Sequence, residues 1–98
     1  NNIPSLALEN GAYLTKKLET LKNKYNFIIE IRGMGLLIGM EMNKDVSSEI
    51  VKICLEKGLL LNAVRPNMLR FMPPLNVSQK EIDVAIKILD ESLSKTVN

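Results

Sequence analysis

With 98 residues, 46% of them hydrophobic, the chain has room for one small domain with a single core and is too apolar for a disordered segment. Its net charge of +2 and its aromatic content of 4% argue against a nucleic-acid-binding protein, which needs a clustered basic face or a stacking platform. One cysteine and no histidine exclude an internal disulfide, a cysteine-based zinc site and a Ser-His-Asp or Cys-His pair.

The sequence carries no signal for membrane insertion or secretion. Its apolar runs are far shorter than the roughly 20 residues of a membrane span. Residues 1–4 lack the basic and apolar regions of a signal peptide. We therefore expect a cytoplasmic protein, in keeping with its unpaired cysteine. Because the chain does not start with Met, we also expect it to begin inside a longer protein.

The first predicted element is a long amphipathic helix over residues 3–25. Lysines lie between its apolar positions, so one face is apolar and the other charged. Pro4 suits the first turn, where the N–H that proline lacks would have no partner. The apolar residues recur at steps of three and four, and they are Ile3, Leu6, Ala7, Leu14, Leu18, Leu21 and Tyr25.

An antiparallel hairpin is predicted next, with strands over residues 27–32 and 36–42. Both segments alternate, and the first is rich in β-branched residues. The link that contains Gly33 and Gly35 is short, which favours a hairpin. In the first strand one face carries Phe27, Ile29 and Ile31, and the other carries Ile28, Glu30 and Arg32. In the second strand the faces carry Leu36, Ile38, Met40 and Met42 on one side, and Leu37, Gly39 and Glu41 on the other.

A second helix follows the turn at residues 43–45, where either Asp45 or Ser47 is expected to cap it. Gly58 ends this helix, since glycine is favoured just beyond a helix C-terminus. The apolar face of the helix consists of Val46, Ile50, Ile53 and Cys54.

A second hairpin is predicted from Leu59-Leu60-Leu61, a turn at residues 64–67 and a strand over residues 68–72. Pro73-Pro74 ends this strand, because proline cannot donate to a ladder. Alternation turns Leu69 and Phe71 to one face and Met68, Arg70 and Met72 to the other.

The last element is a helix that starts at a capping box formed by Ser78 and Glu81. Its apolar stripe consists of Ile82, Ala85, Ile86, Leu89 and Leu93. The whole order predicts a two-layer α+β fold, with a mostly antiparallel sheet of three or four strands and helices on one face. No linker or repeat interrupts it, so residues 1–98 are expected to form a single domain.

Most residues that invite a functional interpretation have a simpler structural one. The pair Gly33 and Gly35 lacks the third glycine and the following helix of a dinucleotide-binding loop, so it is interpreted as a turn. Cys54 lies on an apolar helix face and is expected to be a packing residue. No lysine has the apolar surroundings of a Schiff-base lysine. Glu30 and Glu41 can face each other across the first hairpin, as two solvated carboxylates.

The methionines are a further case of this kind. They cluster on strand faces and are interpreted as core filling rather than as a flexible partner surface.

Arg70 is the residue that favours a functional interpretation most. It is an arginine within an apolar strand, followed directly by a rigid proline pair. One interpretation is a solvated arginine on an edge strand, or one paired with Glu30 or Glu41. The other is an anion anchor, because a planar guanidinium can hold a carboxylate through two parallel hydrogen bonds. Residue type alone leaves both interpretations open.

Taken together, these segments resemble the C-terminal small domain of the class III (ornithine-type) aminotransferases, which use pyridoxal phosphate. The resemblance covers roughly residues 5–95. It rests on the order and spacing of residues 31–41, 58–63 and 68–75 and of the helix start at residues 78–83. Within the family the chain is most similar to the acetylornithine aminotransferases. Ornithine and 4-aminobutyrate aminotransferases are close alternatives, and a stand-alone regulatory or interaction module is an alternative of another class.

The resemblance implies that Arg70 binds the carboxylate of glutamate or 2-oxoglutarate, and of the amino donor N-acetylornithine. It implies that the amino transfer belongs to arginine biosynthesis and needs pyridoxal phosphate as its cofactor. The residues that bind this cofactor in the family lie in a large domain absent from this chain, so no catalytic, cofactor-binding or metal-binding residue is expected here. The family also implies a homodimer for the full-length enzyme, with small-molecule substrates and no nucleic acid or membrane partner.

Overall fold

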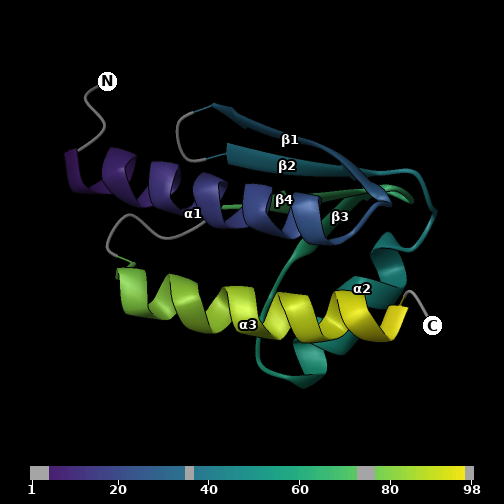
Figure 1. The fold of residues 1–98 in the computed structure, drawn as a ribbon. Coiled ribbons are helices and arrows are strands. Elements are labelled where there is room, and N and C mark those ends of the chain that lie inside the picture. Colours follow the sequence, from purple (N-terminus) through teal and green to yellow (C-terminus); the bar gives the residue numbers. More distant parts are fainter. Residues whose placement is uncertain (1–4, 35–36, 73–76, 97–98) are drawn as a thin grey trace.

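A computed structural model describes residues 5–34, 37–72 and 77–96, which form three helices and four strands (Figure 1). The predicted order of helix, hairpin, helix, hairpin and helix is confirmed. The elements are α1 (Ser5–Lys24), β1 (Ile28–Met34), β2 (Leu37–Met42), α2 (Ser47–Glu56), β3 (Asn62–Arg65), β4 (Met68–Phe71) and α3 (Gln79–Thr96).

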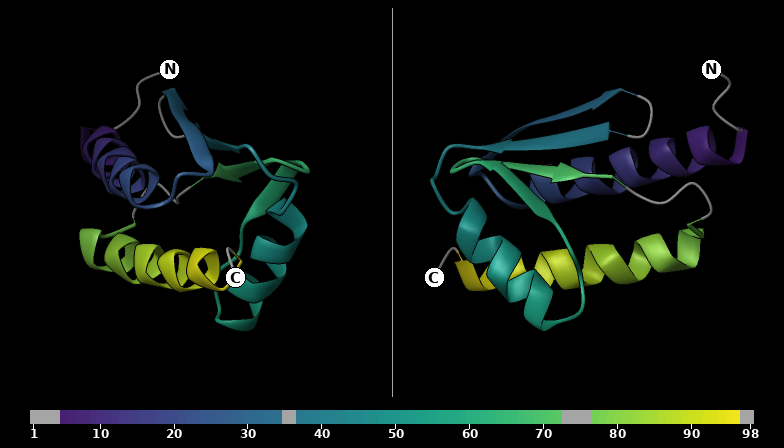
Figure 2. Two further views of the ribbon diagram at one scale, coloured as in Figure 1. Left: turned by 45° about the vertical axis from the view of Figure 1, so that its right-hand side comes forward. Right: turned by 180° about the vertical axis from the view of Figure 1, so that it is seen from behind.

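The four strands form one antiparallel sheet in the order β1-β2-β4-β3. Each hairpin is thus a pair of neighbours, and β2 and β4 join the two hairpins at the centre of the sheet. All three helices lie on the same side of the sheet, with α1 next to it and α3 alongside α1 (Figures 1 and 2). The fold is therefore the predicted two-layer α+β arrangement, and among the described residues no helix lies on the other face of the sheet.

The core lies between the sheet and the helices. Ile38, Met40 and Met42 of β2 are fully buried, as the predicted alternation requires, and Leu37 on the opposite face is half exposed. The helices contribute their predicted apolar stripes, among them Leu14, Leu18 and Leu21 of α1, Ile50 and Cys54 of α2, and Ile82, Leu89 and Leu93 of α3. Hydrophobic burial of this one face fixes which face of the sheet stays open.

The first strand departs from simple alternation. Ile28 pairs with Met42 and Glu30 pairs with Glu41, so the register shifts at Ile29. This bulge turns Ile29 to the open face, where it is 48% exposed, while Ile28 and Ile31 are buried. The predicted grouping of Ile29 with Phe27 and Ile31 is therefore wrong, because the extra residue of a bulge reverses the faces beyond it.

The third strand begins later than predicted. Leu59-Leu60-Leu61 is not a strand but the connection from α2, and the N–H of Leu59 still donates to the carbonyl of Cys54 at 2.8 Å. The strand is Asn62–Arg65, which pairs with β4 across a turn at residues 66–67. A left-handed Gly58, with φ at 93°, ends α2 as predicted. The apolar triplet delays the strand because Leu61 packs into the core before pairing starts.

The predicted cap of α2 is also wrong. The N-cap residue is Val46, which makes no side-chain hydrogen bond, and neither Asp45 nor Ser47 caps the helix. Instead the N–H of Ser47 donates to the carbonyl of Pro66 at 2.9 Å. The turn between β3 and β4 thus takes the place of a side-chain cap.

The capping box of α3 is confirmed in both directions. The Ser78 hydroxyl accepts the N–H of Glu81 at 3.1 Å, and the Glu81 carboxylate accepts the N–H of Ser78 at 2.9 Å. The Pro73-Pro74 stop lies outside the described residues. No helix within residues 5–34, 37–72 and 77–96 has the length and apolarity to span a bilayer.

Candidate functional site

Arg70 lies in β4, one of the two central strands of the sheet. Its neighbours Leu69 and Phe71 point into the core and are buried, so alternation turns Arg70 to the open face. The predicted orientation is confirmed. The interpretation of Arg70 as an arginine on an edge strand is wrong, since β2 pairs with one side of β4 and β3 with the other.

A row of four residues crosses the open face at Arg70. Gly39 of β2 is opposite Arg70, and Arg32 of β1 is opposite Gly39. Asn62 of β3 is opposite Arg70 on its other side. Residues that pair directly across antiparallel strands share a face, so the two arginines flank the glycine. Two strand spacings separate their Cα atoms, which is roughly 10 Å.

A shallow depression lies in the open face at this row. Gly39, which has no side chain to fill the space, is among the residues that line it. Leu37 and Val64 also line it and are 48% and 47% exposed. Its described lining residues are Arg32, Gly33, Leu37, Gly39, Val64, Met68, Leu69 and Arg70. The depression therefore combines guanidinium groups with apolar side chains, which suits an aliphatic carboxylate.

Arg32 is occupied by two carboxylates of the sheet. Its Nε lies 3.1 Å from Oε2 of Glu30, and its Nη2 lies 2.7 Å from Oε1 of Glu41. The hydrogen bond and charge of Arg32 lower the pKa of Glu30, and the same contacts raise the pKa of Arg32. Glu30 and Glu41 do face each other, as predicted, but Arg32 bridges them and they do not form an acid–base pair.

Arg70 has no such partner among the described residues. No ion pair or side-chain hydrogen bond joins it to a residue in 5–34, 37–72 or 77–96. The alternative in which Arg70 pairs with Glu30 or Glu41 is therefore wrong, because both carboxylates form ion pairs with Arg32 instead. The Arg70 guanidinium is left available to a group from outside the chain.

The remaining candidates have structural roles. Cys54 is fully buried and donates to the Ser92 hydroxyl at 3.3 Å, and burial raises the pKa of its thiol. This confirms a packing cysteine. Every lysine of the chain is exposed or half-buried. Met40 and Met42 fill the core as predicted, whereas Met72 is 61% exposed. No group of acidic or thiol side chains that could hold a metal ion occurs in the described ranges.

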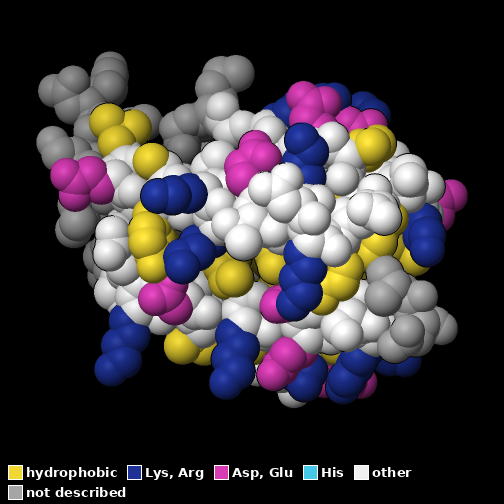
Figure 3. All heavy atoms as spheres, in the orientation of Figure 1, with side chains coloured by type: hydrophobic (Ala, Val, Ile, Leu, Met, Phe, Trp, Pro, Cys, Tyr) yellow, Lys and Arg dark blue, Asp and Glu magenta, His cyan; other side chains and the backbone are white. Residues whose placement is uncertain are grey.

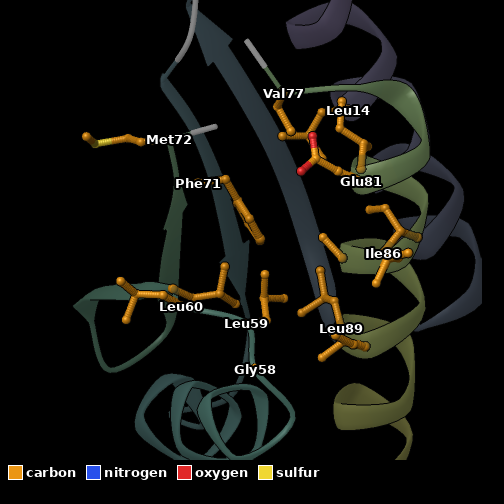
Figure 4. A pocket seen from close by; sticks show the side chains of 15 residues that line it. Leu14, Gly58, Leu59, Leu60, Phe71, Met72, Val77, Glu81, Ile86 and Leu89 are labelled. Atoms are coloured by element: carbon orange, nitrogen blue, oxygen red, sulfur yellow. The ribbon is translucent and has the colours of Figure 1, made fainter. Parts of the chain in front are cut away.

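A second hollow lies on the helix side, between α3, the 59–61 connection and the end of β4 (Figure 4). Its described lining is apolar except for Glu81, and that carboxylate is engaged in the α3 capping box. A ligand site needs a few polar groups that fix orientation, and this hollow offers none that is free. Figure 3 shows basic and acidic side chains interspersed on one face of the molecule, without a gathered basic surface.

The sequence did not indicate that Arg32 and Gly39 belong to this site. Their proximity to Arg70 depends on the pairing of β2 with β4, which joins segments about thirty residues apart. An isolated glycine within an apolar strand was the one available signal for Gly39.

Comparisons with known proteins agree with this fold. The model of the family "Aminotransferase class-III" matches residues 2–93. The acetylornithine aminotransferase of Caldanaerobacter subterraneus is 52% identical over 85 residues, which cover 87% of this chain and 22% of that protein. The acetylornithine aminotransferase of Methanocaldococcus jannaschii is 50% identical over 84 residues, which cover 86% of this chain and 21% of that protein.

Solved structures of aminotransferases contain the same domain. The lysine aminotransferase of M. tuberculosis superposes with a TM-score of 0.84 and 27% identity, over 90% of this chain and 21% of that one. The S-selective transaminase of Bacillus megaterium superposes with a TM-score of 0.84 and 31% identity, over 93% of this chain and 24% of that one. The chain spans about a fifth of the length of its curated relatives. It belongs to the class III aminotransferase family.

Proposed function

We propose that this chain is the C-terminal small domain of an acetylornithine aminotransferase and that Arg70 binds the substrate carboxylate. The full-length enzyme would transfer the amino group of N-acetylornithine to 2-oxoglutarate, as a step of arginine biosynthesis. Two relatives at 50% and 52% identity carry the name acetylornithine aminotransferase, which supports this reaction over those of other family members. The homodimer and the cytoplasmic location stay predictions.

The observation that carries the proposal is the available guanidinium of Arg70 beside a depression in the open sheet face. The acceptor 2-oxoglutarate carries a carboxylate next to its reacting carbon, whereas in N-acetylornithine the carboxylate lies at the other end of the carbon chain from the amino group that is transferred. A planar guanidinium can bind such a carboxylate through two parallel N–H···O bonds. The exposed Leu37 and Val64 would contact the aliphatic part of the substrate. The depression thus offers both kinds of contact that an aliphatic keto acid requires.

The charges around the depression support Arg70 rather than Arg32 as the anchor. Arg32 already faces Glu30 and Glu41, so a further carboxylate there would meet two negative charges. Arg70 sits across Gly39 from this cluster and keeps its own charge uncompensated within the described residues. An incoming carboxylate is therefore attracted most strongly at Arg70.

The described residues do not by themselves fit pyridoxal phosphate, the cofactor of this family. A lysine that binds it must be desolvated in an apolar pocket, and every lysine here is exposed or half-buried. The role that we propose for this chain is therefore to bind and orient the substrate by its carboxylate. Holding the substrate in place lowers the entropic part of the barrier for a reaction performed elsewhere in the enzyme.

The test is the substitution Arg70→Ala in the full-length enzyme. Removing one partner of a charged, hydrogen-bonded pair costs about 2 to 5 kcal/mol, so kcat/KM for 2-oxoglutarate should fall by roughly 30- to 5,000-fold. Arg70→Lys should recover part of this loss, because it restores the charge without the planar fork. Steady-state kinetics of both half-reactions provide the measurement.

Arg65→Ala is the matched control. Arg65 is an exposed arginine at the end of β3 and does not line the depression. Its removal changes the net charge of the chain as much as Arg70→Ala does, and should leave kcat/KM within about threefold of the parent. A change of less than about threefold in the Arg70→Ala enzyme would reject Arg70 as the anchor.

A further inference from the structure

Gly39 is an unusual residue for its place in the fold. It lies in the middle of β2, a central strand whose other residues are Leu37, Ile38, Met40, Glu41 and Met42. Glycine weakens a strand because it loses more backbone entropy on folding and offers no side chain to pack. A glycine in such a position therefore needs a local reason, either in the backbone or in the space around it.

The backbone and packing of this chain give no such reason. Gly58 is the glycine with a positive φ among the described residues, so Gly39 has a backbone that other residues adopt. A Cβ built on Gly39 would have one neighbour within 4 Å, the carbonyl oxygen of Leu69 at 3.9 Å, which is an ordinary contact. The fold of this domain would therefore accept a side chain at position 39.

That side chain would instead fill the depression on the open face. Gly39 shares its face with Arg32 on one neighbouring strand and with Arg70 on the other. The Cβ atoms of directly opposed residues lie about 5 Å apart, so a side chain at position 39 would stand beside the Arg70 side chain. It would occupy part of the depression that Gly39 and Arg70 both line.

We infer that Gly39 is a specificity-determining residue, whose missing side chain makes room for the carboxylate end of the substrate beside Arg70. This inference rests on the proposed function and extends it from the anchor to the shape of the site. It assigns the affinity for the keto acid to two features of neighbouring strands: a guanidinium on β4 and an absent side chain on β2.

The experiment compares Gly39→Ala and Gly39→Val in the full-length enzyme. Misfits of one methyl or methylene group change specificity by factors of about 10 to 200. We therefore expect the KM for 2-oxoglutarate to rise about tenfold or more in Gly39→Val and by a smaller factor in Gly39→Ala. The kcat should stay within about threefold of the parent, because the added atoms weaken binding in the ground state and transition state alike.

Ala12→Val is the control, since it places a valine at an exposed position of α1 that is not among the residues lining the depression, and its KM should equal that of the parent. If both Gly39 variants fold and keep KM within about threefold, the inference is wrong. If Gly39→Val does not fold, Gly39→Ala decides, because the structure has space for its methyl group. A rise in its KM beyond about threefold supports the inference and a smaller change overturns it.

The same assay on Arg70→Ala separates this inference from the proposed function. A lower kcat/KM for 2-oxoglutarate in Arg70→Ala, together with a raised KM in the Gly39 variants, supports both the proposed function and the role of Gly39. A lower kcat/KM in Arg70→Ala with an unchanged KM in the Gly39 variants overturns only the role of Gly39. An unchanged kcat/KM in Arg70→Ala overturns the proposed function, and the inference about Gly39 with it.

Discussion

Tyr13 of α1 and Tyr25, which directly follows α1, donate hydrogen bonds to aspartates of α3, and the two tyrosines differ in burial. The Tyr25 hydroxyl lies 2.5 Å from Oδ1 of Asp90, and the Tyr25 side chain is buried. Lys24 adds a salt bridge to the same carboxylate at 2.9 Å. The Tyr13 hydroxyl lies 2.6 Å from Oδ1 of Asp83 in an exposed pair. The buried contact should therefore stabilise the packing of α1 on α3 more than the exposed one.

The pKa of Asp90 responds to two opposing effects. Burial by itself raises it, but the hydrogen bonds from Lys24 and Tyr25 outweigh burial and hold the pKa below its ordinary value. A carboxyl group with a lowered pKa in the folded state stabilises that state above its unfolded pKa of about 3.9. This contribution is lost as the pH falls from about 4 through the lower folded value.

Asp90→Asn is accordingly predicted to destabilise the chain at pH 7 by about 1 kcal/mol or more, since the charge-assisted hydrogen bonds are lost. At pH 3 the parent and the variant should differ less, because the Asp90 carboxyl of the unfolded parent is then largely protonated and part of its stabilising contribution is lost. Urea unfolding at the two pH values measures the difference. Asp83→Asn is the matched control, and its free energy of unfolding should be close to that of the parent at both pH values. Equal destabilisation by the two variants would contradict the account.

Individual residues differ in how far the sequence predicts their roles. The orientation of Arg70 follows from the alternation of Leu69, Arg70 and Phe71, which is a local property. The pairing of Arg32 with Glu30 and Glu41 depends on the hairpin register and on the bulge at Ile29. The sequence does not encode a bulge by any fixed residue type, so this pairing was visible only in the structure.

At the scale of elements, the two helices that follow a strand begin in different ways. In α3 the side chains of Ser78 and Glu81 satisfy backbone N–H groups within the first turn. In α2 a carbonyl from the turn between β3 and β4, that of Pro66, accepts the N–H of Ser47. The N-terminus of α3 depends on residues close together in the sequence, and the sequence predicts it from the four residues of the capping box. The N-terminus of α2 depends on a contact between residues nineteen positions apart, and the sequence pattern predicts side-chain caps that the structure does not have.

Ser78→Ala should therefore destabilise the domain by about 1 kcal/mol, the usual cost of losing an N-terminal cap. Thermal or urea unfolding of the chain measures this. Ser78→Asp is the matching variant, because its carboxylate can accept the same N–H of Glu81 and should keep most of the stability. If Ser78→Ala unfolds at the same urea concentration as the parent, the capping box contributes nothing to the fold.

The strands show the same division between local and distant causes. β2 was predicted with its faces correct, because it alternates strictly between the core and the open face. β3 was placed too early, at Leu59-Leu60-Leu61, because an apolar triplet has the composition of a strand. Its true position at Asn62–Arg65 follows from the turn at residues 66–67 and from pairing with β4. Composition identified the hairpin, and the turn decided its register.

At the scale of the whole molecule, the helices cover one face of the sheet and leave the other open (Figure 1). The open face carries the exposed apolar side chains Ile29, Leu37 and Val64 beside Arg32 and Arg70. An exposed apolar surface often marks a site of contact with another part of a protein or with a ligand. The chain spans about a fifth of the length of its relatives, so such a contact is expected within a longer enzyme. We propose that this open face is the substrate-facing side of the chain, with Arg70 as the carboxylate anchor.

The most direct measurement compares two amino acceptors in the full-length Arg70→Ala enzyme. One is 2-oxoglutarate, and the other is an aliphatic aldehyde such as butyraldehyde, which has no carboxylate. If Arg70 binds the carboxylate, kcat/KM for 2-oxoglutarate falls at least about 30-fold, while kcat/KM for the aldehyde stays within about threefold of the parent. An equal fall for both acceptors, or no fall for 2-oxoglutarate, would contradict the claim that Arg70 binds the substrate carboxylate.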